Sequence, residues 1–226
     1  MKIEYRPIGF VSSPHQTTNG TPIQPSRASG IEGTVVLEEE YVEALSDLDG
    51  FSHIILICHL HKAADSKLKV VPYLDTELRG LFATRAPSRP NPIGLSVVRL
   101  LGIDGCRLRI EGVDLLDGTP VLDIKPYLAY ADALPDARGS FAYSAPEAPN
   151  SISFSSEAKQ VFRALEMQQQ QLITDVLGYN PRPAYQTDTP NRIFGTRLLN
   201  LEIKWRHENN IVTVLSIEVE NPGKKV

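Results

Sequence analysis

The run GLSVVRLLGIDGCRLRIEGVDL, residues 94–115, decides the fold of this chain of 226 residues. Its two halves, 94–103 and 106–115, are rich in apolar residues that partly alternate with polar ones, as in a half-buried β-strand. The pair Asp104-Gly105 joins them, and such a pair between apolar alternating segments is a strong signal of a β-hairpin. The run therefore predicts two antiparallel strands with one face in a core.

Further strand-like segments lie on both sides of this hairpin. The segment FSHIILICHL (51–60) is almost continuously apolar and predicts a strand that is buried on both faces. Strands are also expected at 3–12, 33–38, 80–84 and 121–129, and a short helix at 41–47. Many short strands with turn residues every 8–12 positions indicate a mainly β domain, either a barrel or a sandwich.

The composition changes in the last third of the chain. Residues 144–156 (SAPEAPNSISFSS) are rich in Ser and Pro and predict a linker. We therefore expect two parts, a β domain over 1–145 and a small appendage over 155–226.

The appendage is expected to be α+β. Apolar residues recur near a helical period over 156–177, and Gly178 follows where a C-terminal helix cap belongs. The segments 197–206 and 211–220 alternate well and predict a β-hairpin.

Composition and cysteine content narrow the class of protein. Hydrophobic residues make up 42% of the chain and charged residues 22%, as in folded soluble domains. The sequence has no apolar run long enough for a membrane helix and no secretory signal pattern at its first residues. Cys58 and Cys106 form no CxxC pair, which argues against a disulfide framework and a cysteine-rich zinc site. We expect a cytoplasmic protein without a membrane segment.

The charge is unevenly distributed along the chain. The net charge of −4 taken as a whole does not indicate a nucleic-acid binder. Residues 31–61 carry seven acidic side chains and no Lys or Arg, whereas residues 62–99 carry seven basic and three acidic ones. The second region can form an anion-binding surface on an acidic protein, and a solvated flexible loop is the alternative interpretation.

The densest unusual segment is GLFATRAPSRPNPIGLS, residues 80–96. Its three prolines fix φ, remove backbone donors and push the preceding residues toward extended geometry. A stiff loop that carries Arg85, Arg89 and Asn91 suits recognition of a carboxylate, a phosphate or a base edge. The alternative is a structural turn between two strands.

The common cofactor and catalytic motifs are absent from the sequence. It contains no GxGxxG, no P-loop, no HExxH, no GxSxG and no EF-hand loop, so a Rossmann or P-loop site is poorly supported. His53, His59 and His61 share parity on one predicted strand, and imidazoles on one face can bind zinc. We favour local hydrogen bonds for His53 and a ligand contact for His61, and we expect no metal site.

An acidic set, Glu111, Asp114, Asp117 and Asp123, surrounds a predicted turn. Carboxylates at strand ends can hold a ribose, an ammonium group or a proton in transfer. Asp117 precedes Gly-Thr-Pro and is expected to be a turn residue that bonds its own backbone. Asp114 lies just inside the strand end and is the better functional candidate.

Several segments together resemble one protein family, the TrmO proteins, also called YaeB or TsaA-like. The signature-like run is FATRAPSRPNPIGLS at 82–96. Other similar segments follow in the family's order: PIGFVSSPH at 7–15, IQPSRASG at 23–30, GFSHI at 50–54, DLLDGTPVLDIKPY at 114–127, LPDARGSFAYSAP at 134–146 and NPRPAY at 180–185. The resemblance covers nearly the whole chain.

The resemblance implies an S-adenosylmethionine-dependent tRNA methyltransferase with a β-barrel fold that is not a Rossmann fold. Such proteins methylate the exocyclic amine of threonylcarbamoyladenosine, just 3′ of the anticodon, in tRNA for threonine. They are homodimers that bind the cofactor near the subunit interface, and the appendage is thought to engage tRNA.

The resemblance also assigns residues. The cofactor contacts of the family fall on Pro25, Ser26, Arg27, His61, Lys62, Arg85, Leu95, Glu111, Gly112, Val113 and Asp114. For the substrate we expect Arg89 to bind the threonine carboxylate, Asn91, Arg182 and Tyr185 to contribute to RNA binding, and Asp114 or Tyr127 to assist removal of the proton.

Two alternatives stay open at this point. One is a methyltransferase that acts on a small metabolite or a protein, and the other is a noncatalytic nucleotide- or RNA-binding module. The first would not need Arg182 for turnover, and the second would bind its ligand without consuming methyl groups.

Overall fold

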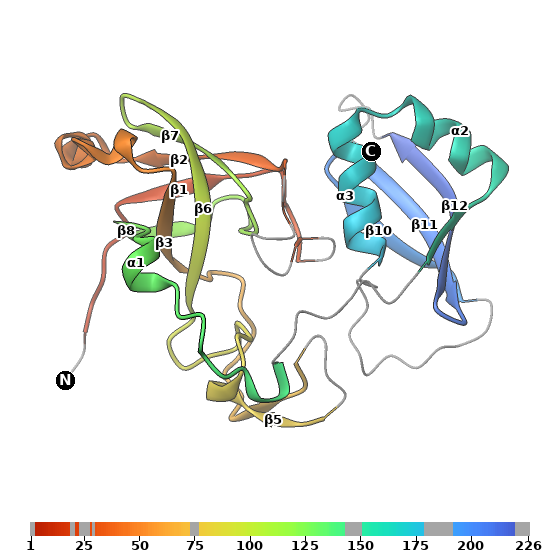
Figure 1. Ribbon diagram of the computed structural model, residues 1–226, viewed down its shortest axis with the longest axis horizontal. Coiled ribbons are helices and arrows are strands. Elements are labelled where there is room, and N and C mark those ends of the chain that lie inside the picture. Colours follow the sequence, from red (N-terminus) through yellow and green to blue (C-terminus); the bar gives the residue numbers. More distant parts are fainter. Residues whose placement is uncertain are drawn as a thin grey trace. The chain divides into compact units, whose positions relative to one another are not determined.

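The structure is a computed structural model. It describes residues 3–18, 21–22, 28, 30–72, 77–142, 151–178 and 192–219. The chain forms two compact units, the first from residues 1–16, 22–72 and 77–145 and the second mainly from residues 146–226 (Figure 1).

Six antiparallel strands close into a barrel in the first unit, in the order β1-β2-β7-β6-β3-β8 (Figure 1). They are β1 (Gly9–Ser12), β2 (Glu32–Leu37), β3 (His53–His59), β6 (Ile93–Asp104), β7 (Arg107–Glu111) and β8 (Pro120–Pro126). Closure rests on the short pairing of β1 with β8, in which Gly9 lies opposite Val121. The expected mainly β fold is confirmed, and the barrel rather than the sandwich is the architecture.

The hairpin predicted over 94–115 is formed by β6 and β7. Asp104 pairs with Arg107, so the two turn residues are Gly105 and Cys106, one position beyond the expected pair. Gly105 has a φ of 55°, a left-handed conformation that glycine adopts without steric cost.

Strand β3 alternates rather than being buried on both faces. Ile54, Leu56 and Cys58 are fully buried in the barrel, whereas Ile55 and Ile57 are only half-buried. The expectation of burial on both faces is therefore wrong for the single chain, and an apolar outer face is left on β3.

The strand expected at 80–84 is also wrong. A two-residue strand β5 (Arg79–Gly80) pairs with β4 (Lys69–Val70), and a 3-10 helix follows at Leu81–Ala83. Leu81 is buried and anchors this helix. The short helix expected at 41–47 is present as a 3-10 helix, Glu39–Leu45. Other short helices are the 3-10 helices Leu48–Gly50 and Ser140–Ala142 and the helix α1 (Ala129–Asp132).

The barrel interior is filled by inward-facing side chains at every second position of its strands. They include Val11, Val35, Leu37, Ile54, Leu56, Cys58, Val98, Leu100, Leu108, Ile110 and Val121, all at most 9% exposed. A polar side chain at an inward position, such as that of Ser96, is therefore an exception in this barrel. It lies near one end of the barrel.

The second unit is a four-stranded sheet with two helices. The sheet order is β10-β11-β12-β9, and β9 runs parallel to β12. The elements are β9 (Ser151–Phe154), α2 (Ser156–Ala164), α3 (Met167–Gly178), β10 (Phe194–Leu198), β11 (Leu201–Glu208) and β12 (Ile211–Val219). The small α+β appendage expected from the sequence is thus present.

Two local expectations in this unit are wrong. Residues 151–154 form strand β9 although they fall within the predicted linker. The helix expected over 156–177 is interrupted at Leu165, whose ψ of 158° ends α2. The predicted hairpin is present with Asn209 and Asn210 both at positive φ in its turn, but its first strand is β11 and not 197–206. Arg197 and Leu198 belong instead to β10, which pairs with β11 on its other side.

The core of the second unit is centred on Trp205, which is 1% exposed. Its indole N–H donates to Thr196 Oγ1 at 2.8 Å, and its ring stacks on Phe194 with centroids 4.9 Å apart. The buried indole therefore has the partner that its polar group requires.

Candidate functional site

The candidate site lies at one rim of the barrel, where β1, β3 and β7 end and β2, β6 and β8 begin. The pairs Ser12–Thr34 and His59–Ile93 mark this rim on two sides of the barrel. Because the strands are antiparallel, segments far apart in the sequence meet here. Most of the predicted cofactor residues that the structure describes lie on these segments.

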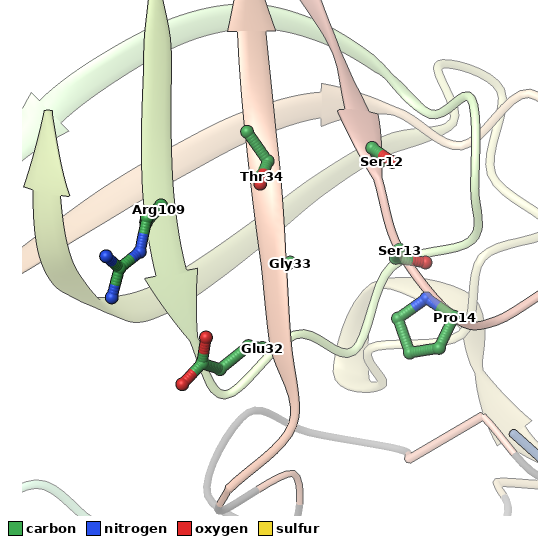
Figure 2. A pocket seen from close by; sticks show the side chains of 7 residues that line it. All are labelled: Ser12, Ser13, Pro14, Glu32, Gly33, Thr34 and Arg109. Carbon is green, nitrogen blue, oxygen red and sulfur yellow. The ribbon is translucent and has the colours of Figure 1, made fainter. Parts of the chain in front are cut away.

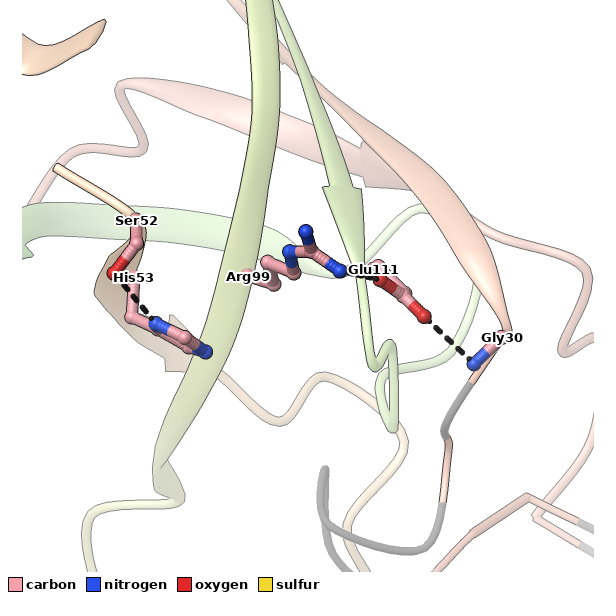
Figure 3. Close-up of polar contacts among 5 residues, drawn as sticks. All are labelled: Gly30, Ser52, His53, Arg99 and Glu111. Carbon is pink, nitrogen blue, oxygen red and sulfur yellow. Dashed lines mark hydrogen bonds and ion pairs between the residues drawn. The ribbon is translucent and has the colours of Figure 1, made fainter. Parts of the chain in front are cut away.

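Glu111 ties two of these segments together. Its Oε1 accepts a hydrogen bond from the Gly30 amide at 3.0 Å, and its Oε2 lies 3.3 Å from Arg99 Nη1 (Figure 3). Figure 3 also shows the neighbouring pair Ser52 and His53 on the other side of Arg99. Glu111 thus fixes the end of the first loop against β7 and β6.

The next two residues continue this attachment through their backbones. The amides of Gly112 and Val113 both donate to the Ile31 carbonyl, at 2.9 and 3.3 Å. Gly112 has a φ of 87°, a conformation that disfavours any residue with a Cβ. Residues 25–27 lie outside the described residues, but the chain that follows them is anchored to the predicted contacts at 111–113.

Asp114 points toward the polar interior of this rim. Ser96 Oγ donates to its Oδ1 at 2.5 Å. Burial raises the pKa of Asp114 to about 6, while the Ser96 hydrogen bond acts in the opposite direction. Burial and the neighbouring Asp114 charge raise the pKa of Cys58 to about 12. A carboxyl and a hydroxyl are therefore hydrogen-bonded at this end of the barrel, near enough to Cys58 for the charge of Asp114 to act on its thiol.

Two polar residues before the first loop complete the rim, and the sequence did not single them out. Ser13 Oγ donates to the Leu115 carbonyl at 2.7 Å, and a ring nitrogen of buried His15 lies 3.0 Å from the Val113 carbonyl. Burial lowers the pKa of His15. Together they hold the segment that contains Asp114.

Asp117 differs from its expected role as a self-contained turn residue. Its carboxylate accepts a hydrogen bond from the amide of Ser13 at 3.0 Å, which links it to a distant segment. Its own amide donates to the His15 carbonyl at 2.8 Å. Asp117 therefore joins β1 to the segment before β8.

His61 and Lys62 follow β3 at the same rim and are exposed. Lys62 Nζ donates to the Gln16 carbonyl at 3.3 Å, which brings it beside the segment after β1. Partial burial, together with the charges of Lys62 and His59, lowers the pKa of His61. Both predicted contacts are thus at the rim, as is the amide of Leu60, which donates to the Pro92 carbonyl at 2.7 Å.

The proline-rich loop enters this rim before β6 and carries three predicted residues. Arg85 and Asn91 are exposed, and Arg89 is half-buried. The Asn91 carbonyl accepts from the Ile93 amide at 2.7 Å, which fixes the last turn before β6. Arg89 points back onto its own loop, where its Nη1 donates to the Thr84 carbonyl at 2.9 Å.

The remaining predicted residues are placed differently. Leu95 is 64% exposed on the outer face of β6, opposite Ile57. Tyr127 follows the last residue of β8, and its amide donates to the carbonyl of His53, the residue that pairs with Arg99. Asp114 accepts its side-chain hydrogen bond from Ser96 rather than from Tyr127. Arg182 and Tyr185 lie outside the described residues.

A shallow recess of about 330 Å³ lies beside this rim (Figure 2). It is lined by residues of β1, β2, β7 and the segment after β1, namely Ser12, Ser13, Pro14, Glu32, Gly33, Thr34 and Arg109. Gly33 is needed at its floor, because a Cβ there would lie 2.9 Å from both the Ser12 carbonyl oxygen and a Val113 methyl group. The lining is polar and open to solvent.

No group of three or more His, Cys, Asp or Glu side chains among the described residues is placed to hold a metal ion. No helix in the same part of the chain is long and apolar enough to cross a membrane.

Two protein-family models match this chain. Residues 10–133 match the tRNA-methyltransferase O N-terminal domain, and residues 147–220 match the TrmO C-terminal domain. The chain belongs to the TrmO family. The resemblance seen in the sequence is therefore confirmed.

Individual TrmO relatives agree with the family match. The tRNA (adenine(37)-N6)-methyltransferase of Escherichia coli K12 is 34% identical over 229 residues, which cover 95% of this chain and 97% of that protein. An S-adenosyl-L-methionine-binding protein of Archaeoglobus fulgidus is 43% identical over 134 residues, 59% of this chain and 96% of its own length. The crystal structure of TrmO from Pseudomonas aeruginosa superposes with a TM-score of 0.77 at 37% identity, covering 97% of this chain and 98% of that one.

Proposed function

We propose that this chain transfers a methyl group from S-adenosylmethionine to the exocyclic nitrogen of adenosine 37 in tRNA. The substrate base is threonylcarbamoyladenosine, and the tRNA accepts threonine. TrmO membership and the E. coli relative, named as a tRNA (adenine(37)-N6)-methyltransferase, support the reaction. The observation that carries it is the barrel rim, where the segments around Gly30, His61, Ser96 and Asp114 meet.

The residues at the rim fit this cofactor. S-adenosylmethionine carries a sulfonium and an ammonium cation, a carboxylate and an adenosine, and when bound it supplies an electrophilic methyl group. The partly buried carboxylate of Asp114 suits a cation, and the exposed guanidinium of Arg85 suits the carboxylate. We assign cofactor binding to Pro25, Ser26, Arg27, His61, Lys62, Arg85, Leu95, Glu111, Gly112, Val113 and Asp114.

Asp114 is the proposed proton acceptor. The reacting nitrogen of threonylcarbamoyladenosine must lose a proton. Because it is urea-like, it is more acidic than a plain adenine amine, so a weak base suffices. With a pKa of about 6, Asp114 is mostly ionised at neutral pH and able to accept this proton. Tyr127 is the second candidate for this role. The rest of the task is alignment of the reacting atoms at roughly 3–3.5 Å.

The tRNA contacts are proposed from charge and from the family resemblance. The segment 62–99 carries seven basic and three acidic side chains, so its local charge opposes the net charge of −4. We propose that Asn91 faces the substrate base, and that Arg182 and Tyr185 contact RNA. Arg89 is given no direct base contact, because its guanidinium is turned onto the backbone of its own loop. Residues 1–145 then form the methyl-transfer domain, and residues 155–226 form a tRNA-engaging domain. The base leaves its stack easily because the anticodon loop is single-stranded.

The proposed homodimer has a candidate interface on the outer face of β3 and β6. Ile55 lies opposite Val97, and Ile57 opposite Leu95, all on the face that points away from the barrel core. Leu95 is 64% and Ile93 44% exposed in the single chain. An apolar strip of this kind supports association through this face, next to the cofactor rim. A cytoplasmic location is proposed because the tRNA substrate is there.

The dimer is tested by sedimentation of two matched variants. Leu95→Asp is expected to shift the protein to monomers, because it places a charge in the strip. Leu68→Asp changes a leucine that is 81% exposed outside the strip and is expected to stay dimeric. A monomeric wild-type protein, or an unchanged mass of Leu95→Asp, would exclude this interface.

The reaction is tested with labelled S-adenosylmethionine and two tRNAs, one with and one without the threonylcarbamoyl group. Label in the first tRNA alone is the expected result, and Asp114→Asn is expected to reduce it strongly at saturating cofactor. Label in both tRNAs would exclude the proposed substrate specificity. Cofactor binding without label in either tRNA would favour a metabolite or protein methyltransferase or a binding module.

A further inference from the structure

The proline-rich loop carries two arginines that are placed in different ways. Arg85 is exposed, whereas Arg89 is half-buried and turned toward the backbone of residues 81–86. A stretch with prolines at 87, 90 and 92 has few backbone N–H groups to satisfy its carbonyl oxygens. Side-chain donors therefore have to fix the shape of this loop.

One nitrogen of Arg89 serves three carbonyl oxygens. Arg89 Nη1 lies 2.9 Å from the Thr84 oxygen, 3.4 Å from the Leu81 oxygen and 3.5 Å from the Ala86 oxygen. Thr84 and Ala86 are the residues immediately before and after Arg85. A single guanidinium thus holds the backbone on both sides of Arg85.

Other contacts keep Arg89 in this position. Its guanidinium carbon lies 5.5 Å from the centre of the Phe82 ring. The Arg89 amide donates to the Pro87 carbonyl at 2.7 Å, which closes a tight turn beneath the side chain. Thr84 Oγ1 donates to the Leu81 carbonyl at 2.8 Å and accepts from the Ala86 amide at 3.3 Å, so the same carbonyl region is held twice.

We infer that Arg89 is a positioning residue that acts on cofactor binding through Arg85, by holding the peptide groups on both sides of it. This inference rests on the proposed cofactor role of Arg85, and it differs from a direct contact of Arg89 with the threonine carboxylate. A planar guanidinium presents several N–H groups in fixed directions, which one ammonium group does not reproduce. Lysine at position 89 is therefore expected to restore only part of the effect.

The main test is a double-mutant cycle on S-adenosylmethionine affinity, measured by calorimetry without tRNA. Arg89→Ala is expected to weaken binding on the order of tenfold, as loss of a charged donor to backbone carbonyls does. In the Arg85→Ala background the same change is expected to alter the affinity less than about twofold, because no positioned group remains. Arg107→Ala, an exposed arginine at the opposite rim, is the control and should bind as the wild type.

Two further measurements separate this inference from its alternatives. Amide hydrogen exchange over residues 81–91, measured without cofactor, is expected to be faster in Arg89→Ala than in the wild type and unchanged in Arg85→Ala. This measurement does not depend on whether the protein binds S-adenosylmethionine. The KM for tRNA is expected to be equal in Arg89→Ala and wild type at saturating cofactor.

The outcomes that overturn the inference are distinct. Equal losses of affinity on removing Arg89 with and without Arg85, or unchanged exchange in Arg89→Ala, would show that Arg89 does not act through Arg85. A raised tRNA KM with unchanged cofactor affinity would make Arg89 a substrate contact. A wild-type protein that does not bind S-adenosylmethionine would instead refute the cofactor proposal, and the exchange data would still decide whether Arg89 orders the loop.

Discussion

Replacing Ser96 by alanine removes the hydroxyl that donates to Asp114 Oδ1 at 2.5 Å. A hydrogen bond to a charged acceptor is worth about 1.5–3 kcal/mol, and each pKa unit corresponds to about 1.4 kcal/mol. The pKa of Asp114 is about 6 with this bond in place. Without it the pKa of Asp114 is expected to rise to roughly 7–8, because burial then acts with less opposition.

The consequence for catalysis follows from the ionised fraction of Asp114. At pH 7 this fraction falls from about nine tenths to between roughly one half and one tenth, so the methyl-transfer rate falls about two- to tenfold. Above about pH 9 the variant and the wild type converge, since both carboxyls are then ionised. Single-turnover rates at saturating cofactor and tRNA, measured from pH 5.5 to about 9.5, give the midpoint directly.

A matched variant and a direct titration make the result decisive. Ser96→Thr keeps the hydroxyl and is expected to keep the wild-type midpoint. The carboxyl carbon of Asp114, assigned by its loss in Asp114→Asn, reports the same pKa by NMR without any turnover. A Ser96→Ala enzyme that is slower at every pH, with its midpoint still near 6, would refute the claim that Ser96 tunes this carboxyl.

Three further predictions concern the same rim. The pKa of Asp114 is raised from 3.8 to about 6, so ionisation of this carboxyl lowers the free energy of unfolding as pH rises through this window. In urea unfolding, Asp114→Asn should therefore be more stable than the wild type at pH 7 by up to about 3 kcal/mol. At pH 3.5 it should have no such advantage. Cys58 is fully buried, and its pKa is about 12. A thiol reagent at pH 8 should therefore label the half-buried Cys106 first and Cys58 only when the protein unfolds. Early labelling of Cys58 would contradict its burial. Gly33→Ala should lower the melting temperature, because its Cβ would lie 2.9 Å from a backbone oxygen of β1, whereas Gly80→Ala meets nothing within 4 Å and should not.

The hairpin of β6 and β7 was predictable because apolar alternation and a turn dipeptide are local features. Closure of the barrel was expected only from the family resemblance, because local patterns do not reveal a short pairing between Gly9 and Val121, more than a hundred residues apart. The break between α2 and α3 at Leu165 carries no proline or glycine, and no local signal marks it. Strand β9 was hidden in a Ser- and Pro-rich segment because its ladder partner, β12, is at the far end of the chain.

Some residues of the candidate site could be recognised from local sequence, whereas others could not because their partners are distant in the chain. Asp114 was expected just inside a strand end, but β7 ends at Glu111 and Asp114 lies three residues beyond it. There Ser96, eighteen positions earlier in the chain, donates to its carboxylate. Ser96 shares parity with Val98 and Leu100, and a polar residue at an inward position was a signal that the sequence offered. His15 offered no such signal, since its partner is the carbonyl of Val113, ninety-eight positions away.

Ser96 and Leu95 are adjacent residues on opposite faces of β6. This connects the proposed role of Asp114 with the proposed dimer interface. Ser96 points inward to Asp114, while Leu95 points outward into the apolar strip beside Ile57. A strand that moves at this position moves both side chains, because consecutive residues share one backbone. Association through the outer face would therefore steady the carboxyl inside the barrel, which gives a physical reason for a cofactor rim to lie next to a subunit interface.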